Sequence, residues 1–180
     1  MNLDLREVSK NFSDQLSKIK VALFDVDGIL TNGLISWDGD PVGFNRSTHT
    51  QDGYGLKILM QAGIKVGVIS GGQSVGVVKR FKENLDLDYV FLGNEDKRAA
   101  YLKILDKGHK DEEILYMGDD FFDLPLLKRA GFSATVPNAS FEIRDIVDYV
   151  TVRPSGQACV REVIDLIRYA QGIVPKIEEF

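Results

Sequence analysis

The sequence is almost without cysteine, and it has no long apolar run. Cys159 is the only cysteine among the 180 residues, so no internal disulfide can form, and no other Cys or His stands beside it at metal-ligand spacing. We interpret it as a helix packing residue in a reducing compartment. No apolar run reaches the roughly 18 residues that cross a bilayer, and the first residues, MNLDLREVSKNF, lack the basic-then-apolar order of a signal peptide. We therefore expect a cytoplasmic protein with no membrane partner.

The sequence also lacks a basic excess. Its formal net charge of -5 argues against broad nucleic-acid binding, in which many Lys and Arg side chains neutralise phosphates. A phosphate ligand would therefore need local cations or a metal. No internal repeat, low-complexity tract or linker divides the chain. With 44% hydrophobic and 27% charged residues, residues 1–180 are expected to form one globular domain.

Short apolar runs alternate with segments of helical periodicity. The runs have the length of strands that are buried on both faces; they cover residues 21–24, 66–70, 89–93, 114–118 and 132–136. The helical segments cover residues 3–18, 55–62, 74–85, 95–107 and 122–130, with a last helix from near 155. This alternation predicts a Rossmann-like three-layer α/β/α fold with a mostly parallel sheet.

One segment interrupts the alternation after the first strand. Residues 34–47 read as two short strands around the turn signal Asp38-Gly39-Asp40, which predicts an inserted hairpin.

Polar residues follow the predicted strands where the carboxyl ends of a parallel sheet bind ligands. They are Asp25, Asp27 and Thr31 after the first strand, Ser70, Gly71 and Gly72 after the second, Lys97 after the third, and Asp119, Asp120 and Asp123 after the fourth. Acids, a hydroxyl, a glycine turn and a lysine together suit phosphoryl transfer. A carboxylate can attack phosphorus, Mg²⁺ brings two anions together, and the remaining groups hold the phosphate oxygens.

Each group also has a simpler interpretation. An Asp-x-Asp pair can be a solvated strand end, and Gly118-Asp119-Asp120 can cap a helix. A calcium loop is disfavoured because Ile29 and Leu30 stand where Asp or Asn and then Gly would be needed. A signalling receiver domain would carry its phosphorylated Asp after the third strand, where this chain offers none. A protein that binds a sugar phosphate without catalysis is the remaining alternative.

Four segments resemble the ordered motifs of the haloacid dehalogenase superfamily of Mg²⁺-dependent phosphohydrolases: DVDGILTNG, ISGG, the lysine of GNEDK, and MGDDFFD. A narrower similarity is to its capless members, which dephosphorylate 3-deoxy-D-manno-octulosonate 8-phosphate or nine-carbon analogues. It rests on QDGYGLKIL, ISGGQS, YMGDDFFDLPLLKRAG and SGQACVRE in addition to the first motif and the hairpin.

The resemblance implies a mechanism. Asp25 would be the nucleophile, and Asp27 the acid that protonates the leaving oxygen and then the base that activates water. Mg²⁺ would be held by the Asp25 carboxylate, the Asp27 backbone carbonyl and Asp119. Asp120 would bind either the ion or a group next to it, and Asp123 would orient Asp119 or Lys97.

The same resemblance assigns the binding groups. Ser70 and the Gly71 amide, with the Thr31 hydroxyl, would hold phosphate oxygens, while Lys97 would offset the charge of Asp25. Members specific for the eight-carbon acid usually have arginine at the positions of Gln51 and Gly72. Gln51 and Gly72 lack the guanidinium that binds a carboxylate through two hydrogen bonds, so a substrate carboxylate would need another cation. Candidate substrate contacts are His49, Gln51, Asp52 and Arg161, with Arg46 as another source of replacement charge.

The spacing of the motifs leaves no room for a lid domain. Only about 40 positions separate Thr31 from Ser70, and fewer than about 30 separate Ser70 from Lys97. In the capless relatives a neighbouring subunit of a tetramer covers each site, so the resemblance implies a homotetramer. Ile35, Trp37 and Phe44 of the hairpin would then be contact residues; a hairpin folded on its own sheet is the alternative.

Overall fold

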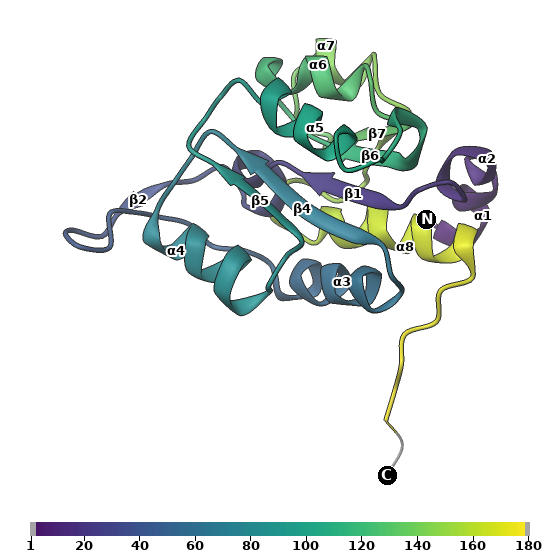
Figure 1. Ribbon diagram of the computed structural model, residues 1–180, viewed down its shortest axis with the longest axis horizontal. Helices are drawn as coiled ribbons and strands as arrows, with labels where there is room; N and C mark the ends of the chain where they lie inside the picture. Colours follow the sequence, from purple (N-terminus) through teal and green to yellow (C-terminus); the bar gives the residue numbers. More distant parts are fainter. Residues whose placement is uncertain (1–2, 179–180) are drawn as a thin grey trace.

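Six parallel strands form the main sheet, in the order β5-β4-β1-β6-β7-β8 (Figure 1). The computed structural model describes residues 3–178. The strands are β1 Val21–Phe24, β4 Lys65–Ser70, β5 Tyr89–Leu92, β6 Ile114–Met117, β7 Phe132–Thr135 and β8 Tyr149–Val150. All four residues of β1 are buried, because β1 lies between β4 and β6 with helices on both faces. This burial explains its unbroken apolar run.

Helices cover the two faces of the sheet. They are α1 Leu5–Lys10, α2 Ser13–Leu16, α3 Thr50–Gln61, α4 Val75–Val78, α5 Arg98–Leu105, α6 Leu124–Leu127, α7 Phe141–Arg144 and α8 Cys159–Gln171. Short helical turns are η1 Val26–Leu30, η2 Lys79–Asn84, η3 Asp111–Glu113 and η4 Phe121–Asp123. In Figure 1, α5 and α6 lie on one face of the sheet, and α3 and α8 lie on the other. The predicted three-layer α/β/α fold with a parallel sheet is confirmed.

The prediction of one continuous helix over residues 3–18 was wrong. The helix breaks between α1 and α2, where Phe12 turns inward. Its ring packs edge-on against Phe132 and Tyr149, with centroids 5.4 Å and 6.0 Å apart. Burial of an aromatic ring against the sheet outweighs the continuity of a short helix. The strand β8 and the helix α7 were not predicted.

The hairpin lies outside the main sheet. Its strands, β2 Ser36–Trp37 and β3 Phe44–Asn45, pair only with each other, and the connecting turn is wider than predicted, since Asp38 N–H donates to the Gly43 carbonyl at 3.0 Å. The rings of Trp37 and Phe44 pack together with centroids 5.0 Å apart. Within residues 3–178 there is no cap domain, and none of the helices is long and apolar enough to cross a membrane.

Candidate active site

A buried lysine joins two carboxylates at the carboxyl edge of the central strands. The Lys97 ammonium lies 2.7 Å from Asp25 Oδ1 and 2.6 Å from Asp123 Oδ1, and the three residues are 2% exposed or less. Asp25 directly follows β1, where its N–H donates to the Met117 carbonyl of β6 at 2.9 Å. The parallel pairing of the strands therefore brings these distant residues together.

Asp123 is fully occupied as a hydrogen-bond acceptor. Its Oδ1 accepts from Lys97 and from the Tyr116 hydroxyl. Its Oδ2 accepts from the N–H groups of Asp119 and Asp120 at 3.1 Å and 3.2 Å. Asp123 thus binds both the loop that carries Asp119 and the ammonium of Lys97.

Two buried carboxylate oxygens, Asp25 Oδ2 and Asp119 Oδ1, have no hydrogen-bond partner within residues 3–178. Carboxylate oxygens of Asp25, Asp119 and Asp123 lie within 4.8 Å of one another. Hard oxygen donors at this spacing suit Mg²⁺. Since Asp123 is already saturated, Asp25 and Asp119 are the residues that fit as ligands.

Burial shapes the charge of this cluster. It raises the pKa of Asp25 well above its usual value, and the neighbouring Lys97 opposes that shift. Burial, with the charges of Asp123 and Asp120, raises the pKa of Asp119 to about 7. Three carboxylates against one ammonium leave excess negative charge, which a bound divalent cation would offset.

The turn after Asp25 is shaped by a glycine. Gly28 has a φ of +92°, and a Cβ built there would lie 2.1 Å from Asp119 Oδ2, so the Asp119 carboxylate packs directly against this backbone. The buried Thr31 hydroxyl accepts from the N–H groups of Gly28 and Gly33 at 3.4 Å and 3.2 Å. Thr31, expected to hold phosphate, closes the turn in this structure.

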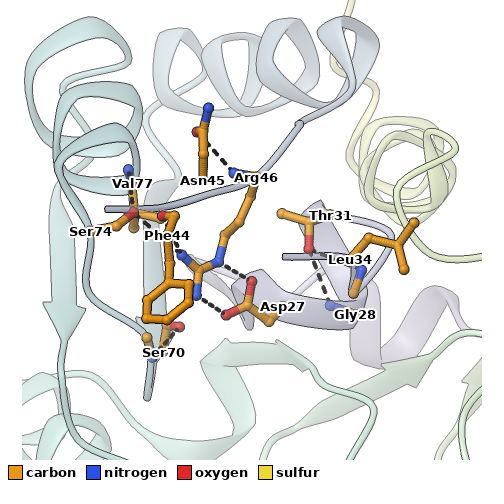
Figure 2. Close-up of polar contacts among 12 residues, drawn as sticks. Asp27, Gly28, Thr31, Leu34, Phe44, Asn45, Arg46, Ser70, Ser74 and Val77 are labelled. Carbon is orange, nitrogen blue, oxygen red and sulfur yellow. Dashed lines mark hydrogen bonds and ion pairs between the residues drawn. The ribbon is translucent and has the colours of Figure 1, made fainter. Parts of the chain in front are cut away.

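Asp27 points out of the same turn and meets an arginine from the hairpin (Figure 2). Its Oδ1 accepts from Arg46 Nε, and its Oδ2 accepts from Arg46 Nη2 at 2.8 Å. The Arg46 side chain is only 6% exposed, and its Nη1 also donates to Ser74 Oγ at 3.3 Å. The Asp27 side chain lies outside the carboxylate cluster.

Ser70 ends β4 and begins the expected phosphate turn. Its side chain is buried, and its Oγ accepts from the Gly72 N–H at 3.1 Å. A Cβ at Gly71 would meet Glu95 Cγ at 2.9 Å, and one at Gly72 would lie 2.6 Å from Arg46 Nη2. Both glycines therefore make room for neighbouring side chains.

Three of the four expected substrate contacts lie at the start of α3, and Arg161 lies in the first turn of α8. His49 caps α3, where its Nδ1 accepts from the Gln51 N–H at 3.2 Å, and Gln51 is exposed. Asp52 has no exposed surface, and its Oδ1 accepts from the Arg161 N–H at 2.7 Å. Arg161 Nε donates to Asp165 at 2.9 Å. The contact between Asp52 and Arg161 thus holds α3 to α8.

Asp120 lies outside the cluster that could hold a metal. It is exposed, and its carboxylate accepts from the Phe121 N–H at 2.7 Å, as a helix cap does. Sequence reasoning missed two residues that support the site: Tyr116, and Phe122, whose ring centroid lies 4.4 Å from Lys97 Nζ. A tyrosine in a buried strand was the available signal, because its hydroxyl needs a partner.

Comparisons with known proteins agree with this geometry. Residues 90–163 match the sequence profile of a family described as haloacid dehalogenase-like hydrolase. The 3-deoxy-D-manno-octulosonate 8-phosphate phosphatase KdsC of Haemophilus influenzae is 36% identical over 159 residues, which are 88% of this chain and 87% of that protein.

Two solved structures are similar over most of the chain. One is the 3-deoxy-D-manno-octulosonate 8-phosphate phosphatase of Moraxella catarrhalis with magnesium, phosphate and KDO, which has a TM-score of 0.85 and 34% identity, covering 91% of this chain and 93% of that one. The other is the cobalt-bound phosphatase of H. influenzae, with a TM-score of 0.81 and 36% identity, covering 88% and 92%.

Proposed function

Because the chain belongs to the haloacid dehalogenase-like hydrolases, we propose that it is a Mg²⁺-dependent phosphomonoesterase that works through an aspartyl phosphate. One observation carries the proposal. Asp25 Oδ1 is paired with the buried Lys97 ammonium at 2.7 Å, while Oδ2 has no partner. A carboxylate held at one oxygen and free at the other is oriented for nucleophilic attack.

In the first step, Asp25 Oδ2 forms a bond to phosphorus as the bond from phosphorus to the ester oxygen breaks. The leaving oxygen takes a proton from Asp27. Asp119 and the Asp27 backbone carbonyl, with the Asp25 oxygen that does not attack, would hold Mg²⁺, which when bound offsets the negative charge of nucleophile and phosphoryl group. Lys97 keeps Asp25 in place throughout.

In the second step, Asp27 takes a proton from water, and the water oxygen bonds to phosphorus. The bond between phosphorus and Asp25 breaks, which releases inorganic phosphate and restores the Asp25 carboxylate. Ser70 Oγ and the Gly71 N–H would hold phosphoryl oxygens during both steps, with Thr31 keeping the turn in shape.

For the substrate we propose a phosphorylated keto-deoxy sugar acid, 3-deoxy-D-manno-octulosonate 8-phosphate or a nine-carbon analogue. Similarity to phosphatases of that acid, at 32–36% identity over most of the chain, supports this choice. A phosphatase of another small sugar phosphate is the alternative, because Gln51 and Gly72 stand where phosphatases of the eight-carbon acid usually have arginine.

We also propose that four copies of the single domain assemble and cover one another's sites. No lid domain is present among the described residues. Trp37 and Phe44 of the hairpin are 58% and 56% exposed, and large exposed aromatics side by side mark an interaction surface.

The test is phosphate release from 3-deoxy-D-manno-octulosonate 8-phosphate and from ordinary sugar phosphates, with Mg²⁺ and with excess chelator. We expect Mg²⁺-dependent release that is fastest with the sugar acid phosphate and is abolished in Asp25→Asn. The exposed Asp14→Asn is a control that should behave as wild type. Wild-type rates in Asp25→Asn would exclude the mechanism, and absence of turnover with every phosphate would indicate a silent binding protein.

A further inference from the structure

The ion pair between Asp27 and Arg46 is difficult to reconcile with an Asp27 that carries protons. Both oxygens of Asp27 accept from the Arg46 guanidinium (Figure 2). A two-oxygen pairing of this kind suits an ionised carboxylate, because a carboxylic acid bears a hydrogen on one oxygen. Arg46 must therefore release at least one oxygen when Asp27 holds the proton for the leaving group.

Arg46 comes from a part of the chain that lies outside the main sheet. It directly follows β3, a two-residue strand that pairs only with β2 and lies outside the main sheet. Besides Asp27, its guanidinium makes only long hydrogen bonds among the described residues, 3.3 Å from Nη1 to Ser74 Oγ and 3.4 Å to the Phe44 carbonyl. Few anchoring contacts mean that a small shift of the hairpin moves the guanidinium.

A cavity beside Arg46 suits an anion. Its volume is about 140 Å³, and residues at both ends of the turn that carries Asp27, Val26 and Thr31, contribute to its wall. Asn45, Thr48 and Arg80 also line it, and no acidic residue does. A carboxylate that entered this cavity would meet two arginines, of which Arg46 is already paired with Asp27.

Gly72 leaves the space that Arg46 occupies. A Cβ at residue 72 would lie 2.6 Å from Arg46 Nη2 and 2.9 Å from Asp27 Oδ2. The guanidinium therefore lies against the turn that begins at Ser70, where the phosphoryl group of the proposed reaction would be held.

We propose that Arg46 is the specificity-determining cation of this site. It turns at least one N–H from Asp27 to the carboxylate of a phosphorylated sugar acid. The inference rests on the proposed function and deepens it: a substrate with a carboxylate gains a contact with Arg46 that a substrate without one does not make.

The experiment compares two substrates in wild type, Arg46→Gln and Arg46→Lys. One substrate is 3-deoxy-D-manno-octulosonate 8-phosphate; the other is 4-nitrophenyl phosphate, which has no carboxylate and whose leaving group needs no proton. In Arg46→Gln we expect kcat/KM to fall about 10- to 100-fold for the sugar acid phosphate, the loss expected for a hydrogen bond to a charged group. For the aryl phosphate it should stay within about threefold of wild type, because that substrate uses neither Arg46 nor the proton of Asp27.

Arg46→Lys should recover part of the loss, since it keeps the charge without the two-pronged geometry. The exposed Lys82→Gln, on the nearby turn η2, should change neither substrate. Gly72→Ala should also lower kcat/KM for the sugar acid phosphate, because its Cβ would crowd Arg46 Nη2 at 2.6 Å and Asp27 Oδ2 at 2.9 Å.

Equal losses for both substrates in Arg46→Gln would show that Arg46 only maintains the site, and no loss for the sugar acid phosphate would exclude recognition. Either result overturns the inference and leaves the proposed function intact. If wild type hydrolyses neither substrate, the proposed function fails, and calorimetric binding of the free sugar acid still decides the inference. A Kd at least tenfold weaker in Arg46→Gln supports it, and an equal Kd contradicts it.

Discussion

The side chains of Asp25, Lys97 and Asp123 at the sheet edge are 2% exposed or less, whereas Trp37 and Phe44 on the hairpin are more than half exposed. The buried groups follow strands of the main sheet and are joined by the Lys97 ion pairs. The two strands of the hairpin pair only with each other, outside the main sheet. Groups that must keep one geometry for bond formation thus lie in the core, and the groups proposed to recognise substrate or subunits lie on an element outside the main sheet.

The largest effect expected from breaking the buried region is that of Lys97→Met. It leaves Asp25 and Asp123 buried beside each other without a cation, which should lower the free energy of unfolding by about 3–5 kcal/mol and also abolish activity. Urea unfolding measures the loss. The matched control is Lys103→Met on the same helix, α5, whose exposed side chain should matter by less than about 0.5 kcal/mol. Equal losses of unfolding free energy in the two variants would contradict the proposed difference between the buried site and the exposed surface.

Asp52 shows how burial changes the pKa of a carboxyl group that has no lysine ammonium beside it. Burial raises its pKa from 3.8 to about 6, although His49, Arg153 and Arg161 oppose the shift. Between these pH values Asp52 binds more protons in the folded chain than in the unfolded one, so its contribution to stability is greatest below about pH 4 and is lost as the pH rises through about 6.

Asp52→Asn keeps an oxygen for the Arg161 N–H and removes the charge. Its free energy of unfolding should therefore rise relative to that of wild type between pH 4 and 8. Two pKa units set the gain at no more than about 3 kcal/mol. Unfolding curves across this range measure it, and a constant difference between the two proteins would contradict the prediction.

Gly28→Ala sharpens the comparison at the backbone. The new Cβ would meet the Asp119 carboxylate at 2.1 Å, while in the control Gly33→Ala its nearest atom is Gly28 Cα, at 4.0 Å. Both positions have positive φ, so both variants carry the backbone cost of about 1 kcal/mol. Gly28→Ala should lose about 1–2 kcal/mol more and bind Mg²⁺ more weakly by calorimetry. Equal Mg²⁺ affinities would show that Asp119 does not hold the ion.

The smallest effect on the stability of one chain is expected on the hairpin. Trp37→Ser should change its free energy of unfolding by less than about 0.5 kcal/mol, because the ring is mostly exposed. It should nevertheless dissociate the proposed tetramer, which light scattering measures. Val152→Ser is a control with a 65% exposed residue outside the hairpin. A wild-type monomer at micromolar concentration with full activity would contradict the assembly.

The sequence predicted the buried region better than the hairpin, and the reason is physical. Strand ends in a parallel sheet converge, so placing Asp25, Lys97 and Asp123 after strands was enough to bring them together. The pairing of Arg46 with Asp27 joins residues 19 positions apart across the hairpin. It depends on the path of an irregular loop and on the space at Gly72, which no periodic pattern reveals.

The break of the first helix has a similar origin. The apolar spacing over residues 3–18 is helical, yet Phe12 finds Phe132 and Tyr149 only in the assembled fold. Asp52 and Arg161 were expected at the substrate. The structure shows a contact between them that holds α3 to α8, a long-range packing role that local sequence does not encode.

The central claim is that Asp25 carries the phosphoryl group, and the most direct measurement is to trap it there. Asp27→Asn should still react once with 4-nitrophenyl phosphate and Mg²⁺, because that leaving group needs no proton, but it should hydrolyse the intermediate slowly. Acid quenching and mass spectrometry should then find one burst of nitrophenol for each active site and a phosphoryl group on the peptide that contains Asp25. A burst without phosphorylation, or with the phosphoryl group on another residue, would contradict the account.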